Sequence, residues 1–145
     1  MPTVREILTQ KSSGIWTIGP GDTVFSALRK MAEKEVGAVL VVDEAGHLVG
    51  IFSERDYARK GILEGRLSKD TPVSEIMTPK VYYVSPGQHL EECLALMTEK
   101  RIRHLPVLEE GRLCGVISIG DVGKALIADR EFLIRNLEKY ISGDR

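Results

Sequence analysis

Two short segments of the chain carry a serine followed three residues later by an aspartate, each where a predicted strand turns into a helix. The segments are Ser53-Glu54-Arg55-Asp56 and Ser118-Ile119-Gly120-Asp121. Amides at a helix N-terminus favour a phosphate, a serine hydroxyl adds a hydrogen bond, and a carboxylate accepts from both hydroxyls of a ribose. Together these groups suit a nucleoside phosphate.

The same spacing also has a purely structural interpretation. A serine three residues before an acid, at the start of an apolar helix, is a capping-box pattern that satisfies the first helix amides without a ligand. Taken singly, either segment fits a cap better than a ligand site. A second group able to bind an anion is needed to favour the ligand hypothesis.

A basic pair, Arg103-His104, supplies such a group directly before the apolar run 105–107. The guanidinium can bind a phosphate bidentately and the imidazole can donate to it. Alternatively, the pair is a solvated helix end, where positive charge meets the helix dipole. The matching residues of the first segment, Gly37 and Ala38, cannot bind an anion by side chain but leave room for a ligand. Arg55 is a further phosphate candidate, or a surface arginine.

Cysteine and histidine do not form a recognisable metal or redox pattern. Cys93 and Cys114 lie within apolar patterns and lack the CxxC spacing, so we expect both to be buried as small hydrophobic residues. His47 and His89 have no histidine counterparts in the repeat described next. We therefore expect no metal site.

The candidate residues recur because the chain contains two copies of one unit. Residues 15–21 align with residues 81–87 at a spacing of 66, and after a one-residue slip the two Ser-x-x-Asp segments coincide. Residues 4–7 and 73–76 begin the two copies. An internal repeat of this kind decides the fold before any local feature does.

Each copy predicts the same element order, β-α-β-β-α, which is an α/β (α+β) unit with helices on one face of its sheet. Each first strand is followed by a Pro-Gly turn, and Gly46 and Gly111 mark the turns between the last two strands. The predicted strands are 15–18, 38–43 and 48–53, then 81–84, 105–109 and 113–118; the first helices carry apolar residues at 24, 27, 28 and 31, then at 90, 93, 94 and 97.

The predicted boundaries are residues 1–66 for the first copy, 67–128 for the second and 129–145 for a C-terminal helix, whose apolar residues are Phe132, Leu133, Leu137, Tyr140 and Ile141. Residues 61–71 are polar and form a short connector. Thr71-Pro72 resembles a helix cap with proline at the first helical position. One copy alone would be a poor domain, so we expect the two to form one module.

Composition excludes several classes of partner. Twenty basic and twenty-one acidic residues give a net charge of −1 over 145 residues, so no global field attracts nucleic acid or an anionic membrane. The longest apolar run, Ala38 to Val42, has the length of a strand, and the N-terminus lacks an apolar signal core. We expect a cytoplasmic protein.

The run from Met97 to Val107, followed by Gly111 to Asp121, resembles the signature of a CBS domain, and Gly37 to Asp56 repeats it. The resemblance extends from about Val4 to Ile127. It implies a tandem CBS pair, packed sheet to sheet with pseudo-twofold symmetry and with two clefts between the repeats. Members of the family bind AMP, ADP, ATP, S-adenosylmethionine or NAD(H).

The resemblance also implies roles for individual residues. Asp56 and Asp121 match ribose-binding acids, and Arg103 and His104 match the basic pair that reaches phosphate in the gamma subunit of AMP-activated kinase. The other expected phosphate contacts are Ser53, Ser118, Gly120 and Arg55. The expected adenine pocket comprises Ile15, Trp16, Thr17, Gly37, Ala38, Val81, Tyr82 and Tyr83. Trp16 and Tyr82 can either stack on the base or fill the core.

The function that this resemblance implies is a stand-alone regulatory sensor that binds AMP, ATP or NADH, forms a homodimer and signals to a separate protein. A scaffold with empty clefts is the first alternative. A hydrolytic set of Ser118, His104 and Asp121 is the second, but the sequence has no nucleophile elbow, Walker loop or Gly-x-Gly-x-x-Gly fingerprint. We therefore expect no catalytic residues and no enzyme.

Overall fold

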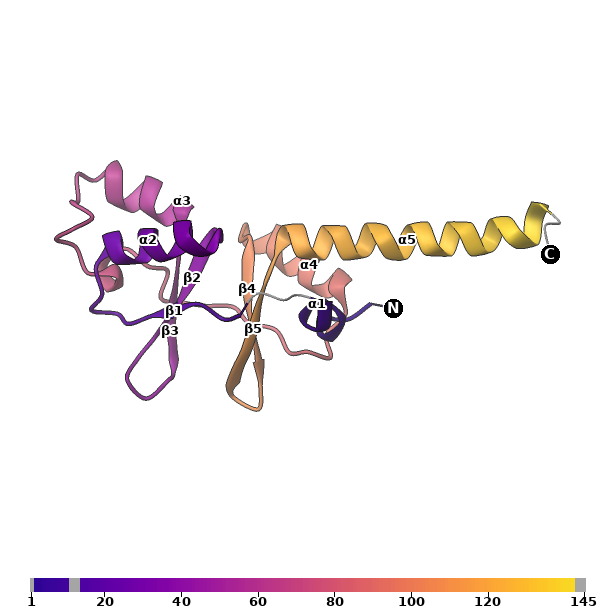
Figure 1. The fold of residues 1–145 in the computed structure, drawn as a ribbon, viewed down its shortest axis with the longest axis horizontal. Helices are drawn as coiled ribbons and strands as arrows, with labels where there is room; N and C mark the ends of the chain where they lie inside the picture. The colour runs from indigo at the N-terminus through magenta and orange to yellow at the C-terminus, as the bar shows by residue number, and fades with distance from the viewer. Residues whose placement is uncertain (1, 11–13, 143–145) are drawn as a thin grey trace. The chain divides into compact units, whose positions relative to one another are not determined.

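The computed structural model describes residues 2–10 and 14–142, and side-chain exposure as far as residue 137. The chain forms two compact units: one is Gly14–Tyr82, and the other joins the N-terminal residues to the chain from Tyr83 onward. Figure 1 labels the helices and strands of both units. The predicted mixed α/β fold with two similar copies is confirmed.

The unit 14–82 contains a three-stranded sheet. Strand β1 (Thr17–Ile18) pairs in parallel with β2 (Ala38–Val42), which pairs antiparallel with β3 (Leu48–Ser53). Helix α2 (Val24–Lys34) follows β1 and packs on β2. Its apolar residues have helical spacing and therefore meet the sheet on one face. The buried cluster comprises Ile18, Val24, Ala27, Met31, Val39, Val41, Phe52, Val73 and Ile76.

The chain leaves β3 through the short helix α3 (Glu54–Asp56), which continues as a π-helical segment, η1 (Tyr57–Ile62). A 3₁₀ turn, η2 (Val73–Glu75), lies in the same unit. The second helix expected after the last strand of the first copy is thus present. The proposed cap at Thr71 is wrong, because the Thr71 hydroxyl donates to the Leu67 carbonyl at 2.7 Å and the residue preceding the turn is Pro72.

The other unit is built on one antiparallel hairpin, β4 (His104–Glu109) and β5 (Arg112–Ser118). Helix α4 (Leu90–Lys100) precedes it and α5 (Ile119–Ser142) follows it. Helix α1 (Val4–Gln10) packs on β5 and α5 of this unit. The fully buried residues include Leu90, Met97, Leu105, Ile117 and Val122.

The predicted strand 81–84 is wrong except at its last residue. Only Val84 pairs, as an isolated parallel bridge to Val107. In the first copy, the amide of Leu40 donates to the Trp16 carbonyl at 3.2 Å and extends the pairing of β1. The counterpart of Leu40 is Pro106, which has no amide hydrogen to donate. A proline therefore shortens this strand to one bridge.

The predicted separate C-terminal helix is also wrong, because α5 runs without a break from Ile119 to Ser142. No proline or pair of glycines interrupts the helical pattern after Gly123. The exposed apolar residues of α5 include Ile127, Phe132, Leu133, Ile134 and Leu137.

The segment that begins each sequence copy packs in the unit that holds the sheet of the other copy. A methyl group on Gly115 of β5 would meet the side chain of Leu8 in α1, and one on Gly50 of β3 would meet Met77. Gly50 and Gly115 are equivalent residues of the repeat. The two units are thus built alike, each with an apolar side chain over the same glycine.

Of the two cysteines, Cys93 is buried as expected and Cys114 is not. Cys114 lies in β5 with an exposed side chain, so the expectation of a buried residue is wrong there. Its neighbour Gly115 is on the face covered by Leu8, so Cys114 points to the other face of β5. The counterpart of Cys114, Val49, packs against the buried cluster of its own unit.

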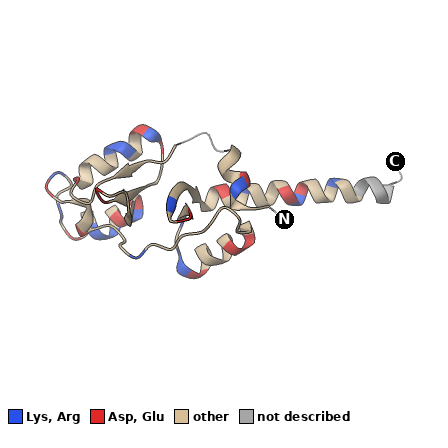
Figure 2. Cartoon of the chain, turned by 90° about the horizontal axis from the view of Figure 1, so that it is seen from below, with Lys and Arg blue, Asp and Glu red and all other residues tan. Residues whose placement is uncertain are grey.

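Lys and Arg are interspersed with Asp and Glu along the helices and loops of both units (Figure 2). This distribution agrees with the formal net charge of −1. Across residues 2–10 and 14–142, every helix is too short or too polar to cross a lipid bilayer.

Candidate functional site: the two strand-to-helix loops

Both Ser-x-x-Asp segments form capping boxes. In the first copy the Ser53 amide donates to Asp56 Oδ2 at 2.9 Å, and the Asp56 amide donates to Ser53 Oγ at 3.2 Å. In the second copy the equivalent distances, for Ser118 and Asp121, are 2.9 Å and 3.0 Å. The structural interpretation of the pattern is confirmed in both copies. Each cap uses Oδ2 of its aspartate.

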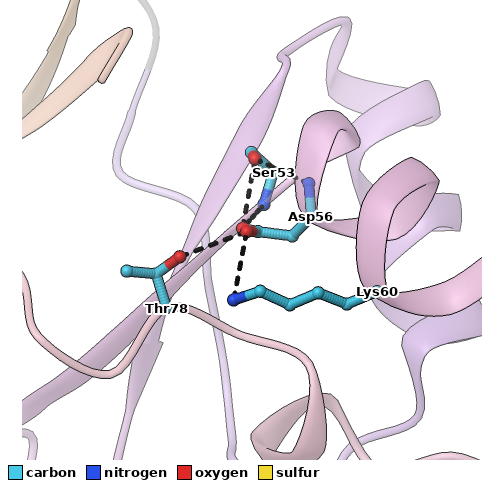
Figure 3. A network of polar contacts seen from close by, with 4 residues as sticks. All are labelled: Ser53, Asp56, Lys60 and Thr78. Atoms are coloured by element: carbon cyan, nitrogen blue, oxygen red, sulfur yellow. Dashed lines mark hydrogen bonds and ion pairs between the residues drawn. The ribbon is translucent and has the colours of Figure 1, made fainter. Parts of the chain in front are cut away.

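The second carboxylate oxygen of Asp56 is also occupied (Figure 3). Asp56 Oδ1 accepts a 3.1 Å hydrogen bond from the Thr78 hydroxyl and lies 3.7 Å from the Lys60 ammonium nitrogen. The Ser53 hydroxyl adds a 3.1 Å bond to Oδ2. The Asp56 side chain is only 14% exposed, so these partners replace water around a nearly buried charge.

Lys60 was not among the residues predicted from the sequence. An acid four residues before a lysine is the spacing of a helical ion pair, and this signal was available. Thr78 could not have been found in the same way, because it is separated from Asp56 by 22 positions. It lies next to β3 because its backbone bridges Ile51.

The basic pair of the second copy lies beside the Ser118 loop. The Ile119 amide donates to the Arg103 carbonyl at 2.8 Å, and His104 is directly opposite Ser118 in the β4–β5 register. Opposite residues of an antiparallel pair project on the same face of the sheet, so His104 and Ser118 share a face. The structure thus brings together Arg103, His104, Ser118, Gly120 and Asp121.

The first copy has the same backbone arrangement with different side chains. The Glu54 amide donates to the Gly37 carbonyl at 3.1 Å, and Ala38 is opposite Ser53. Its basic residues come instead from the helix, as Arg55 and Lys60. The two loops therefore offer positive charge from different elements.

Trp16 packs at the edge of the buried cluster of its unit. The Lys34 ammonium lies 4.5 Å from the ring centroid, a cation–π distance, so one partner of the ring comes from α2. Its Nε1 is buried and has no hydrogen-bond partner among the described residues. Packing against the core is thus established for Trp16, while a role beside adenine stays a prediction.

The remaining adenine-pocket candidates divide between the two units. Ile15, Thr17, Val81 and Tyr82 belong to the unit of the Ser53 loop, as do Gly37 and Ala38, whereas Tyr83 begins the chain of the other unit. Thr17 lies in β1, opposite Leu40 of β2. Tyr83 has an exposed ring. Their contact with a base stays a prediction.

Metal-ligating side chains do not cluster in groups of three or more within the described part of the chain. Burial raises the pKa of the Cys93 thiol to about 11, and the nearby Glu92 carboxylate acts in the same direction. A thiol with such a pKa is protonated at neutral pH and is a poor nucleophile or metal ligand.

Comparison with known proteins identifies the repeat. The family model for the CBS domain matches residues 4–62 and 73–128. A CBS-domain structure from Burkholderia ambifaria, described as a signal-transduction protein, is 54% identical with a TM-score of 0.85, over 88% of this chain and 96% of that one. The mitochondrial CBS domain-containing protein CBSX3 of Arabidopsis thaliana is 38% identical, over 97% of this chain and 72% of its own length.

A more distant structure, the CBS domain pair of protein MJ0100, has the same fold, with a TM-score of 0.79 at 22% identity over 89% of this chain and 98% of that one. The two matched segments coincide with the two copies that the internal repeat indicates. The chain therefore belongs to the CBS domain family and contains two CBS domains in tandem.

Proposed function

We propose that this CBS pair binds an adenine nucleotide as a regulatory ligand, without turning it over, and passes the signal to a partner protein. The observation that carries the proposal is the Arg103–Ile119 backbone hydrogen bond, because it holds a basic side chain next to a loop with a hydroxyl and a carboxylate. These are the groups needed at the two ends of a nucleoside phosphate.

The phosphate would bind at the first turn of α5. This helix has 24 residues, so the dipole at its start favours an anion. A side chain at Gly120 would meet only the Ser118 hydroxyl within contact distance, so the backbone is open to close approach by a ligand. Arg103 and His104 would add charge-assisted hydrogen bonds.

The ribose would bind at Asp121, whose Oδ2 is used by the cap. A carboxylate can accept hydrogen bonds from both hydroxyls of a ribose. Arg103 and Asp121 would thus serve opposite ends of one ligand. The corresponding roles in the first copy fall to Ser53, Arg55 and Asp56.

A related structure supports the ligand class. The CBS domain pair of protein MJ0100 was solved in complex with 5′-methylthioadenosine and S-adenosyl-L-methionine. These two compounds share adenine and the ribose ring with AMP, ATP and NADH, which are the ligands we propose for this chain. A site that binds adenine and ribose would accept all of these ligands. The groups around Arg103 would distinguish between them by their phosphate groups.

A ligand regulates only if it binds one state of the protein better than another. We propose that the responding states differ in association, with a second copy of the chain or with a separate regulated protein. A homodimer is the simpler of the two arrangements, because closed twofold assemblies are the commonest oligomers of soluble proteins.

A scaffold without a ligand is the second candidate, and the complete capping boxes favour it, since both loops are satisfied as they stand. Thermal unfolding distinguishes the two. A ligand present at 100 times its dissociation constant stabilises the folded state by about 2.7 kcal/mol, whereas a scaffold shows no shift.

The experiment that tests the proposal is calorimetric titration of the protein with AMP, ATP, NADH and S-adenosylmethionine. Saturable binding of at least one of them, lost in the double variant Asp56→Asn and Asp121→Asn, supports it. Asparagine keeps one side-chain oxygen for the cap, so the variant tests the ribose contact with little loss of helix stability. No saturable heat or thermal shift with any of the four ligands overturns it.

A further inference from the structure

We propose that the second half of α5 pairs with the same segment of a second copy of the chain, in an antiparallel arrangement. The contact surface is the α5 stripe, which consists of the exposed apolar residues Ile127, Leu133, Ile134 and Leu137. The inference deepens the proposed function and rests on the association of two copies proposed there. It names the surface through which that homodimer forms.

The α5 stripe lies on one side of the helix. Residues three, four or seven positions apart on a helix face the same way, so Ile127 and Ile134 lie on one line, beside Leu133 and Leu137. The four residues are 47 to 61% exposed. Their side chains form an apolar patch on the order of 400 Å², and continuous patches of this size on a monomer often mark an interaction site.

The same face of α5 is already an interface in its first half. Val122 is buried and Leu126 is half-buried where α1 and α4 pack on α5. Steps of four, seven and four residues lead from Val122 through Leu126 and Leu133 to Leu137, so all four lie on one face. Beyond α1 and α4, the helix extends away from its own unit (Figure 1). The packing face thus continues where its own unit no longer covers it.

Most of the α5 stripe lies outside the CBS domain itself, because the match to the family model ends at residue 128. Residues 127–137 carry two acids, Asp129 and Glu131, and two bases, Arg130 and Arg135. A helix that binds an anionic membrane surface is rich in Lys and Arg on its polar face, and this segment has no such excess. A segment without net charge does not repel its own copy, so a second copy fits it.

The order of the charges favours the antiparallel direction. Glu131 and Arg135 are four residues apart and border the α5 stripe on the same side. In an antiparallel pair with Leu133 facing Leu133 of the second copy, residue 131 of each chain is level with residue 135 of the other. Opposite charges then meet twice. A parallel pair would instead place Asp129 and Glu131 level with the same acids of the second copy.

The first test is sedimentation equilibrium of the full chain over about 1 µM to 1 mM, because a patch smaller than a standard interface predicts a weak dimer. Leu133→Glu places two like charges at the centre of the contact and should raise the dissociation constant of the dimer at least about tenfold. Phe132→Glu is the matched control. Phe132 is 59% exposed but lies on the opposite side of α5, so this change should leave the constant unaltered.

The second test reverses the charges. Glu131→Arg and Arg135→Glu should each raise the dissociation constant by about three- to tenfold, since each places like charges level with one another at two points. The variant with both changes restores opposite charges and should return close to the parent constant. Circular dichroism confirms that the helix is kept in each variant. If the two single reversals have no effect, the antiparallel arrangement is wrong.

The inference is overturned if the parent protein stays monomeric throughout this range, or if Leu133→Glu has no more effect than Phe132→Glu. A dimer that neither change affects forms through another surface. Calorimetry with AMP on the same proteins keeps the two proposals apart. If AMP binds but the α5 stripe makes no contact, only the inference fails. If the stripe pairs but none of AMP, ATP, NADH and S-adenosylmethionine binds, the proposed function fails instead.

Discussion

The carbonyl of Arg103 accepts a 2.8 Å hydrogen bond from the amide of Ile119. This bond joins the residue before β4 to the first residue of α5, and it is repeated between Gly37 and Glu54 in the first copy, at 3.1 Å. The residue whose carbonyl accepts this hydrogen bond is thus an arginine in one CBS domain and a glycine in the other. Under the proposed nucleotide binding, the two loops would therefore differ in their affinity for a phosphate.

Replacing Asp121 by asparagine should weaken the binding of adenosine and the binding of AMP by a similar factor. The carboxylate is proposed to accept both ribose hydroxyls, which the two ligands share, and losing one of two such bonds to a charged group costs about 1.5 to 3 kcal/mol. Calorimetry with each ligand gives the two ratios. Asp43→Asn, in the turn after β2, is the matched control and should leave both unchanged. A loss confined to AMP would contradict the ribose role.

Replacing Glu35 by glycine should stabilise the protein. Glu35 ends α2 in the left-handed region, at φ +55° and ψ +44°, where a side chain is unfavourable and glycine is not. After the greater freedom of glycine in the unfolded chain is counted, the gain should be about 0.5 kcal/mol. Urea unfolding measures it.

The control for this change is Glu33→Gly, inside the same helix, which should destabilise by about 1 kcal/mol. If Glu35→Gly destabilises as much as Glu33→Gly, the left-handed end of α2 is not present in solution.

Adding a methyl group to Gly115 should destabilise the unit that contains α1. The new Cβ would overlap Leu8, and overpacking of this kind costs about 1 to 3 kcal/mol. Shortening Leu8 to alanine in the same molecule makes room, so the double variant Leu8→Ala, Gly115→Ala should lose less than the sum of the single variants. Additive losses in urea unfolding would show that α1 does not pack on β5.

The two cysteines should differ in reactivity. Cys114 is exposed and should react with a thiol reagent in the native protein at pH 8, while Cys93 should react only after unfolding. With its pKa raised to about 11, the Cys93 thiol is ionised in about one molecule in a thousand at pH 8, quite apart from its burial. Mass spectrometry locates the label. Equal labelling of both thiols in the native state would be inconsistent with the buried position of Cys93.

The raised pKa of Cys93 also predicts a pH dependence of stability. The folded state keeps the proton up to about pH 11, whereas the unfolded thiol ionises near its ordinary pKa of 9.0. The unfolded state therefore binds fewer protons in this range, and the free energy of unfolding should fall as pH rises from 9 to 11. The variant Cys93→Ala, which has no thiol, should show a smaller fall; an identical fall would assign the effect to other groups.

Most of the fold could be predicted because the sequence contains two copies of the same pattern. Helices α2 and α4, and the hairpins that turn at Gly46 and Gly111, follow from apolar spacing and turn residues that recur in both copies. The features that were missed are of two kinds. The first kind is the loss of one hydrogen bond between strands. Pro106 has no amide hydrogen to donate, so the first strand of the second copy is shortened, and the apolar pattern of the sequence does not reveal this.

The second kind is long-range contact. The docking of Leu8 against Gly115, and of Thr78 against Asp56, joins residues far apart in the chain, so local pattern could not foresee either. The exposed side chain of Cys114 depends likewise on which face of β5 is covered. The positions of the serine, aspartate and basic residues could be predicted, because they all stand next to strand ends, whereas their contact with a ligand stays a prediction.

The most direct test of the proposed function compares Arg103→Ala with the intact protein by calorimetry, using adenosine and AMP. Arg103→Ala should weaken the binding of AMP by about 1 to 3 kcal/mol and leave the binding of adenosine nearly unchanged, because the guanidinium is proposed to contact only the phosphate. Arg112→Ala, at the far end of the same hairpin, should change neither. Equal losses of AMP and adenosine in Arg103→Ala, or no loss of either, would contradict a phosphate site beside the Ser118 loop.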